Sequence, residues 1–175
     1  MENITLISGT NRPSSYTLRV ATYYKQLLQN DGFETQLLTL EQLPANFLFS
    51  ETFGNRTEAF QLLIDTYVLN SNKFVFVAPE YNGSFPGILK GFLDAVPPSY
   101  WNGKKAALLG VAQGRAGNLR GIEQLTLILN YLKVNVLYNK LPISVVDTLF
   151  DDAGNLTHIP TQNAISMHKD AFVKF

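Results

Sequence analysis

Four polar side chains gather ahead of a predicted helix, in a segment that suits the binding of a phosphate group. The segment SGTNRPSSYT, residues 8–17, contains Thr10, Arg12, Ser15 and Thr17. Amides at a helix N-terminus point at a bound anion, and the helix dipole stabilises it by about 0.3–1 kcal/mol. Arg12 adds a charge-assisted hydrogen bond in this interpretation. The same residues also suit an ordinary helix cap without a ligand, because Ser and Thr are favoured there.

The usual nucleotide-binding fingerprints are absent from the chain. No G-x-G-x-x-G follows the first predicted strand, and no G-x-x-x-x-G-K-[ST] occurs in the sequence. Residues 8–17 offer hydroxyl groups and one arginine where those motifs use glycines. A single terminal phosphate therefore fits it better than a bridging pyrophosphate.

A second loop, PEYNG at residues 79–83, follows the apolar run KFVFVA at 73–78. Such a run predicts a buried strand, and the loop then lies at the carboxyl end of the sheet, where open α/β sheets bind ligands. Gly83 permits positive φ and close approach of the backbone to a flat ring, and Tyr81 offers an aromatic wall. The amides of Asn82 and Gly83 are the expected donors to the edge of a heterocycle. An ordinary strand-to-helix turn uses the same residue types.

A third loop, QGRAGNLRG at residues 113–121, follows another predicted strand at the same end of the sheet. Gln113 and the backbone of Gly114 and Arg115 are candidates to contact a ring edge. Arg115 or Arg120 is suited to offset charge on a reduced cofactor or to meet a nicotinamide phosphate. A flexible loop with two solvated arginines is the alternative interpretation.

Strand-like and helix-like patterns alternate along the chain, which predicts an α/β fold with a parallel sheet. Five strands between helices indicate a three-layer flavodoxin-like sandwich with strand order 2-1-3-4-5. In that order the first and third strands are neighbours, and both are followed by the specialised loops. The predicted strands are residues 3–8, 33–40, 73–78, 104–112 and 134–138.

Helix boundaries follow from capping signals. The first helix is expected to begin near Ser14 or Ser15 and to end at residues 30–32, where Gly32 is a stop signal. Ser84 is expected to cap the third helix, with Pro86 in its first turn. The last segment predicts a further helix, and its expected inward residues are Ala164, Met167 and Ala171.

Composition limits the possible functions. The 175 residues are predicted to form a single domain, 1–175, which buries roughly 70% of its unfolded surface. Lys plus Arg and Asp plus Glu number 14 each, so charge suggests neither nucleic acid nor an anionic membrane as a partner. The N-terminus does not look like a signal peptide and no apolar stretch is long enough to cross a membrane, so we expect a cytoplasmic protein.

Cysteine is absent, so any redox chemistry must come from a bound cofactor. His158 and His168 lie in the C-terminal segment, away from the three loops and from any carboxylate cluster. No metal-ligand spacing appears. We interpret both histidines as surface or packing residues and expect no metal site.

Together these motifs resemble the NAD(P)H-dependent FMN reductases, a family that includes flavin, quinone, chromate and azo-compound reductases. The family pattern P-E-Y-N-G-S-x-P-G-x-L-K is matched over residues 79–90, and its W-x-G-K…G…G-x-x-G-x-x-R-G pattern over 101–121. The likeness extends over about residues 3–148. The family's phosphate pattern, [ST]-x-R-x-x-S-x-[NT], is matched by Thr10, Arg12, Ser15 and Thr17.

The resemblance implies a flavodoxin-like fold, FMN as cofactor, NADPH or NADH as electron donor, and a homodimer or homotetramer. It also implies that the FMN phosphate lies in the first loop and the isoalloxazine ring on PEYN. Thr17 departs from the Asn of many members, and Gln113 replaces a small residue. The predicted cofactor-binding residues are Thr10, Arg12, Ser15, Tyr16, Thr17, Pro79, Glu80, Tyr81, Asn82, Gly83, Gln113, Gly114 and Arg115.

The leading functional hypothesis is an FMN-dependent NAD(P)H oxidoreductase. It passes hydride through flavin N5 to a small acceptor, such as a flavin or quinone, by a ping-pong mechanism, and no side chain of its own is catalytic. A flavodoxin-like electron carrier is one alternative, although the neutral charge and Arg12 argue against it. A flavin-binding or interaction module without turnover is the other.

Overall fold

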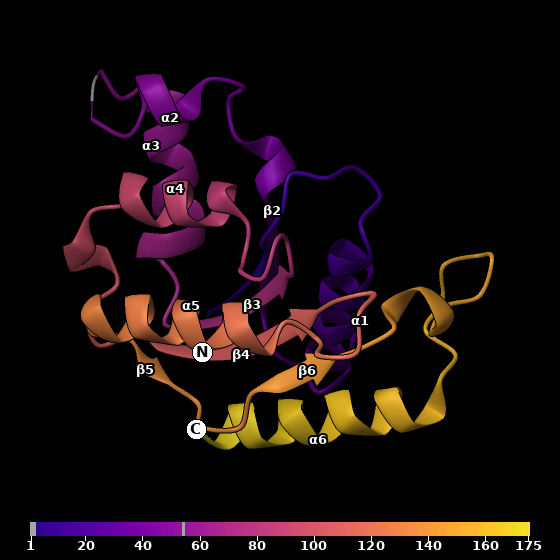
Figure 1. Cartoon of the computed structure of the whole chain (residues 1–175). Helices are drawn as coiled ribbons and strands as arrows, with labels where there is room; N and C mark the ends of the chain where they lie inside the picture. The colour runs from indigo at the N-terminus through magenta and orange to yellow at the C-terminus, as the bar shows by residue number, and fades with distance from the viewer. Residues whose placement is uncertain (1–2, 54) are drawn as a thin grey trace.

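The computed structural model of the chain describes residues 3–53 and 55–175 (Figure 1). Within these residues six strands form one parallel sheet, in which β2, β1, β3, β4 and β5 lie in that order and β6 also pairs with β4. The predicted order 2-1-3-4-5 is confirmed. The strands are β1 Ile4–Ser8, β2 Thr35–Thr39, β3 Lys73–Pro79, β4 Lys105–Val111, β5 Asn135–Val136 and β6 Leu141–Ile143.

The fifth strand of the prediction, residues 134–138, is divided in the structure. β5 pairs with Lys105 and Ala106 at the start of β4, whereas β6 pairs with residues 109–111 at its end. The chain leaves the sheet between them, and the side chain of Tyr138 is 88% exposed. One edge of the sheet is therefore built from two short strands, and β6 was not predicted.

Helices cover both faces of the sheet because strand side chains alternate between the faces. In β3, Phe74 and Phe76 face the core beneath α3, α4 and α5, whereas Val75 and Val77 face the core beneath α1 and α6. Burial on both sides explains the uninterrupted apolar run of this strand. The helices are α1 Tyr16–Asn30, α2 Phe47–Ser50, α3 Glu58–Ile64, α4 Gly87–Ala95, α5 Leu119–Tyr131 and α6 Ile159–Lys174.

Two expectations about helix starts have different outcomes. Ser15 caps α1 as predicted, since its side chain accepts a hydrogen bond from the amide of Leu18. Ser84 does not cap α4: the N-cap position is Pro86, which makes no side-chain cap, and Ser84 belongs to the preceding turn. The physical reason is that Ser84 pairs with the backbone of Tyr81, so the helix begins later.

The predicted C-terminal helix is present as α6, and Ala171 packs against the core as expected, but the prediction for Met167 was wrong. Met167 is 71% exposed, and the buried side chains are those of Ile165, His168, Lys169 and Phe172. The helix packs on α1, where the His168 ring contacts Tyr24. The side chains that reach the core are therefore shifted by one residue, from Ala164 and Met167 to Ile165 and His168. His168 is therefore a packing residue, as expected.

The amino end of the sheet holds a closed polar cluster. Thr5 is fully buried, and its hydroxyl contacts the hydroxyl of Ser71 at 2.6 Å and the amide nitrogen of Gln36 at 2.9 Å. The ammonium of Lys104 donates to the carbonyls of Val68, Leu69 and Ser71. No helix in the described part of the chain is both long and apolar enough to cross a membrane.

Candidate active site

A cavity of about 260 Å³ lies at the carboxyl end of the sheet, between the loops that follow β1, β3 and β4. This is the switch point of the strand order, where parallel sheets of this type bind ligands. Its volume lies just below the roughly 300–1,000 Å³ typical of small-molecule pockets. The lining residues are Arg12, Pro13, Ser14, Ser15, Tyr16, Thr17, Pro79, Glu80, Tyr81, Val111, Ala112, Gln113 and Val146.

The first loop presents the N-terminus of α1 to this cavity. The first amides of a helix have no carbonyl partner within it, and the side chain of Ser15 takes only that of Leu18, at 3.2 Å. No acidic residue stands in the first turn of α1. The Arg12 side chain is exposed and makes no ion pair among residues 3–53 and 55–175. A run of six lining residues, 12–17, thus offers uncompensated positive potential.

The second loop folds back in a tight turn that matches its sequence. Tyr81 and Ser84 exchange both backbone hydrogen bonds, at 2.8 and 3.2 Å. The two residues between them, Asn82 and Gly83, have φ of 54° and 83°. Positive φ at both central positions defines a type I′ turn, for which Asn-Gly is the favoured pair. Their amides take no part in the two bonds of the turn.

A hydroxyl pair fastens the first loop to the second. The side-chain oxygens of Thr10 and Tyr81 lie 2.9 Å apart, and the Thr10 oxygen also accepts from the amide of Arg12 at 3.2 Å. Thr10 is fully buried, whereas Tyr81 is 36% exposed and lines the cavity. The Thr10 hydroxyl therefore links the two loops and does not itself face the cavity.

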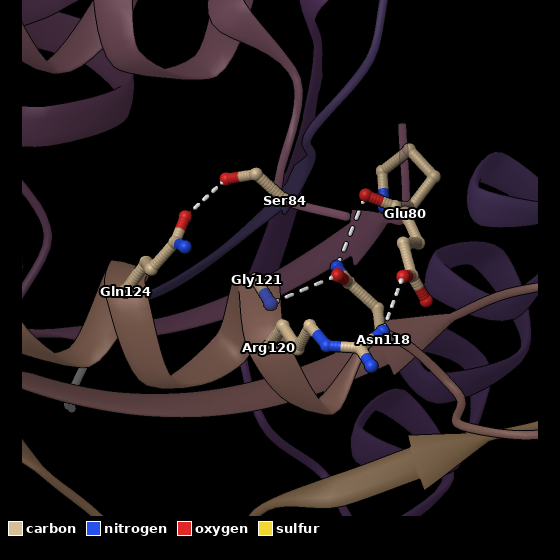
Figure 2. Close-up of polar contacts among 7 residues, drawn as sticks. Glu80, Ser84, Asn118, Arg120, Gly121 and Gln124 are labelled. Atoms are coloured by element: carbon tan, nitrogen blue, oxygen red, sulfur yellow. Dashed lines mark hydrogen bonds and ion pairs between the residues drawn. The ribbon is translucent and has the colours of Figure 1, made fainter. Parts of the chain in front are cut away.

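The third loop is fastened to the second by Asn118, a residue that sequence reasoning missed. Asn118 is fully buried, and its carboxamide nitrogen donates to the carbonyls of Ala78 and Pro79. Its oxygen accepts from the amide of Gly121 (Figure 2). The available signal was the preference for Asn at an N-cap, because Leu119 begins α5.

Charge within the cavity is nearly balanced. Glu80 is the only carboxylate among the described residues that line it, and its side chain is 19% exposed. Its oxygen lies 3.8 Å from the guanidinium of Arg120, which is 74% exposed (Figure 2). In residues 3–53 and 55–175 no group of three or more His, Asp or Glu side chains is arranged to hold a metal ion.

The segment after β6 also contributes to the cavity, through Val146. The preceding residue, Val145, has φ of 49°, which is a strained conformation for a β-branched side chain. The amide of Val146 donates to Ala112 at 3.1 Å, and the Ser144 hydroxyl donates to Arg115 at 2.8 Å. No sequence signal marks Val146, because it reaches the site only through this pairing.

The predicted site residues are partly brought together. Those that line the cavity are Arg12, Ser15, Tyr16, Thr17, Pro79, Glu80, Tyr81 and Gln113. Those outside its lining are Thr10, Asn82, Gly83, Gly114 and Arg115. Lining residues that were not predicted are Pro13, Ser14, Val111, Ala112 and Val146.

Comparison with known proteins identifies the family. The sequence pattern described as NADPH-dependent FMN reductase matches residues 3–146. The chain belongs to this family. Its members are oxidoreductases, and the chain is therefore an enzyme that uses FMN together with a reduced nicotinamide nucleotide.

Individual relatives agree with the family. An NAD(P)H-dependent FMN reductase from Pseudomonas aeruginosa is 37% identical over 156 residues, which is 86% of this chain and 82% of that protein. A 2-hydroxy-1,4-benzoquinone reductase from Burkholderia is 26% identical over 97% of this chain and 93% of that protein. The structure of an NAD(P)H:acceptor oxidoreductase from Paracoccus denitrificans superposes with a TM-score of 0.80 at 23% identity, covering 99% of this chain and 96% of that one, which supports the fold.

The residues present fit FMN at the phosphate end of the cavity. A phosphate dianion needs hydrogen-bond donors and positive charge, and residues 12–17 supply both without a competing carboxylate in that run. Pro79 and Tyr81 of the second loop add apolar surface to the same cavity lining.

Proposed function

We propose that this protein is an FMN-dependent NAD(P)H oxidoreductase that reduces a small acceptor, such as a flavin or quinone, by a ping-pong mechanism. One observation carries the proposal. The N-terminus of α1 and Arg12 line a cavity that is also lined by Pro79, Glu80 and Tyr81 of the second loop. Membership of the FMN reductase family supports this assignment of the cavity.

The phosphate group is bound in this proposal by residues 12–17. Arg12 donates a charge-assisted hydrogen bond, and the hydroxyls of Ser15 and Thr17 together with the first amides of α1 complete the donor set. Ser15 keeps its capping bond to Leu18, so its hydroxyl hydrogen remains available for the anion. Tyr16 lines the same end of the cavity and screens the phosphate from solvent.

The flavin ring lies in this proposal along Pro79, Glu80 and Tyr81, with Gln113 at its edge. The Asn82 and Gly83 amides make no hydrogen bond to the backbone of the described chain, and in this proposal they donate to the ring. Gly114 and Arg115 act through their backbone from the third loop. Thr10 contributes indirectly, by fixing the position of Tyr81.

When bound, FMN supplies the redox chemistry, accepting hydride at N5 from the nicotinamide and delivering it to the acceptor. The protein side chains bind and orient, and no general acid among them is needed. Glu80, paired with Arg120, is the one carboxylate beside the ring in the described part of the cavity. In this proposal the nicotinamide and the acceptor bind in turn against the same exposed face of the flavin ring. The oxidised nicotinamide must therefore leave before the acceptor binds, which is the basis of the ping-pong order.

The test is a spectrum of the purified protein, followed by anaerobic addition of NADPH or NADH. A flavin absorption band that bleaches with the nicotinamide and returns with a quinone supports the proposal. A flavodoxin-like carrier would hold FMN but would not oxidise NAD(P)H in steady state. Protein that is colourless as purified, and that retains no flavin absorption after incubation with FMN and removal of unbound flavin, would argue against both functions and favour an interaction module.

Parallel initial-velocity lines in double-reciprocal plots of donor against acceptor are the expected sign of ping-pong order. Intersecting lines would show that donor and acceptor occupy the site together. Comparison of NADPH with NADH, and of a quinone with free flavin, identifies the preferred pair.

We also propose that residues 1–175 form one domain and that the chain assembles as a homodimer or homotetramer in the cytoplasm. Exposed apolar side chains on and beside α2 support an assembly, since Phe49 is 91% and Phe53 92% exposed. Light scattering of the purified protein measures the number of chains, and a monomer at micromolar concentration would contradict this part.

A further inference from the structure

The carboxamide of Asn118 is the buried centre of the contact between the second and third loops. Its nitrogen donates to Ala78 at 2.9 Å and to Pro79 at 3.0 Å, and its oxygen accepts from Gly121 at 3.2 Å. Both donor hydrogens and the acceptor oxygen are therefore used. Asn118 is fully buried with φ of 64°, a conformation that Asn adopts more readily than most residues.

The two carbonyls that accept from Asn118 are those of Ala78 and Pro79, the last two residues of β3, and Pro79 is also the first residue of the second loop. The third bond caps the N-terminus of α5. One side chain thus joins the strand that leads into the proposed flavin-binding wall to the helix that follows the third loop. Figure 2 shows the side chain of Asn118 between Gly121 of α5 and the end of β3.

Two outer contacts flank this centre. Arg120 pairs with Glu80 at 3.8 Å, and the Ser84 hydroxyl donates to Gln124 (Figure 2). Exposed contacts of this kind contribute little free energy, because water competes for each group. The buried Asn118 contact is accordingly the strongest of these three side-chain contacts across the junction, and it adds to the backbone pairing of Pro79 with Val111 of β4.

The absence of a side chain at Gly121 lets α5 approach this closely. A Cβ at Gly121 would lie 2.2 Å from the Asn118 oxygen and 2.6 Å from the amide of Phe85. The first turn of α5 therefore lies directly against the chain that follows the ring loop. Across this close contact, hydrogen bonds of Asn118 rather than bulky side chains join the end of β3 to the start of α5.

We propose that Asn118 is a positioning residue for the flavin ring: it fixes Pro79 and, through it, the wall formed by Glu80 and Tyr81. The inference rests on the proposed FMN site. Asn118 does not line the cavity, so it acts only through the backbone that it holds. Loss of its carboxamide leaves two buried carbonyls at the end of β3 without their donor, so the wall formed by Glu80 and Tyr81 is held less firmly against the third loop.

The decisive variant is Asn118→Gly, because glycine adopts the positive φ without strain and the variant removes all three hydrogen bonds of the side chain. Asn118→Asp keeps the shape but turns a carboxylate toward two carbonyl oxygens. We expect FMN affinity to fall about tenfold in Asn118→Gly and further in Asn118→Asp. The visible circular dichroism and the reduction potential of bound FMN should also change, because both report the surroundings of the ring.

The matched control is Thr5→Val at the opposite end of the sheet. Thr5 is also fully buried and loses two side-chain hydrogen bonds in this variant. It should lower thermal stability while leaving FMN affinity, circular dichroism and potential unchanged. A purely structural role for Asn118 predicts the same pattern for Asn118→Gly, and that result would overturn the inference.

Titration of the wild type separates this inference from the proposed function. Wild-type protein that binds no FMN would overturn both, whereas equal affinity in wild type and Asn118→Gly would overturn only the inference. If neither Asn118 variant folds, Asn118→Ser decides, because a serine hydroxyl keeps an acceptor for the Gly121 amide while the two donors to Ala78 and Pro79 are lost. We expect it to weaken FMN binding about fivefold with a dichroism change in the same direction, and an unchanged spectrum and affinity would reject the inference.

Discussion

Polar side chains cluster at both ends of the sheet, but only one of the two clusters leaves its donors unused. At the amino end, Thr5, Ser71 and Gln36 bond to one another, and Lys104 is taken up by backbone carbonyls. At the carboxyl end, Arg12 is exposed without a partner in the described chain and the first amides of α1 face a cavity. Composition alone does not distinguish the two clusters. The difference lies in whether the polar groups are satisfied within the fold.

The comparison assigns stability to the closed cluster and ligand affinity to the open one. A buried polar group that has its partners contributes to the free energy of unfolding. An exposed donor beside a cavity contributes little until a ligand arrives. Substitutions at the two ends should therefore change different measured quantities.

The largest effect is expected at Arg12. Arg12→Ala should weaken FMN binding by about 2–3 kcal/mol, roughly 30–150-fold, because the phosphate loses a charge-assisted hydrogen bond. Thermal stability without FMN should not change, since Arg12 is exposed. Fluorescence titration of FMN measures the affinity, and an unchanged dissociation constant would refute the phosphate role of this residue.

The core beneath α6 should respond to acid. Burial lowers the pKa of His168 to about 4, against an offsetting backbone contact from Asn139, and the ring meets the Tyr24 hydroxyl at 3.1 Å. Because the folded pKa lies below the unfolded value of about 6.5, stability is retained above that value and lost as pH falls toward 4. At pH 5 the loss should be about 2 kcal/mol relative to pH 7.5.

The variant His168→Gln isolates this contribution, because it keeps a polar side chain that does not titrate. Urea unfolding at pH 7.5 and pH 5 should show a smaller difference in the variant than in the wild type. FMN affinity at pH 7.5 should be the same in both, since α6 lies outside the cavity lining. Identical pH dependence of the two proteins would show that His168 does not control acid stability.

Lys104→Met tests the closed cluster directly. Burial lowers the pKa of Lys104, yet its ammonium satisfies the carbonyls of Val68, Leu69 and Ser71 at the end of the segment after α3. We expect the free energy of unfolding to fall by about 1–2 kcal/mol with FMN affinity retained. A loss of FMN affinity equal to that of Arg12→Ala would remove the distinction between the two ends.

The smallest effect is expected where the first loop joins the second. Tyr81→Phe removes the hydroxyl contact to Thr10 but keeps the aromatic wall, so FMN affinity should fall by about 1 kcal/mol, roughly fivefold. Thr10→Val removes the same contact together with the acceptor of the Arg12 amide. If adding Tyr81→Phe to Thr10→Val causes no further loss, the contact between the two hydroxyls is responsible, and additive losses would contradict that assignment.

Local patterns predicted the first loop well because its chemistry is written in consecutive residues. Ser15 caps α1, and Arg12, Ser15, Tyr16 and Thr17 all line the cavity. The strand order also followed from the alternation of patterns. The prediction that Met167 points inward was wrong because Met167 is apolar, and periodicity could not anticipate that the His168 ring would be buried against Tyr24.

By itself the sequence determined the alternation of strands and helices and the residues of the first loop that face the cavity, because each depends on hydrophobic period or on turn chemistry within a few positions. Tertiary structure alone decided that β6 shares an edge with β5, that Val146 joins the site and that Asn118 ties the end of β3 to α5. These features depend on contacts between segments about 30 to 40 residues apart, as in the bond from Asn118 to Pro79. A local sequence pattern does not indicate which distant carbonyl a buried side chain will bond to.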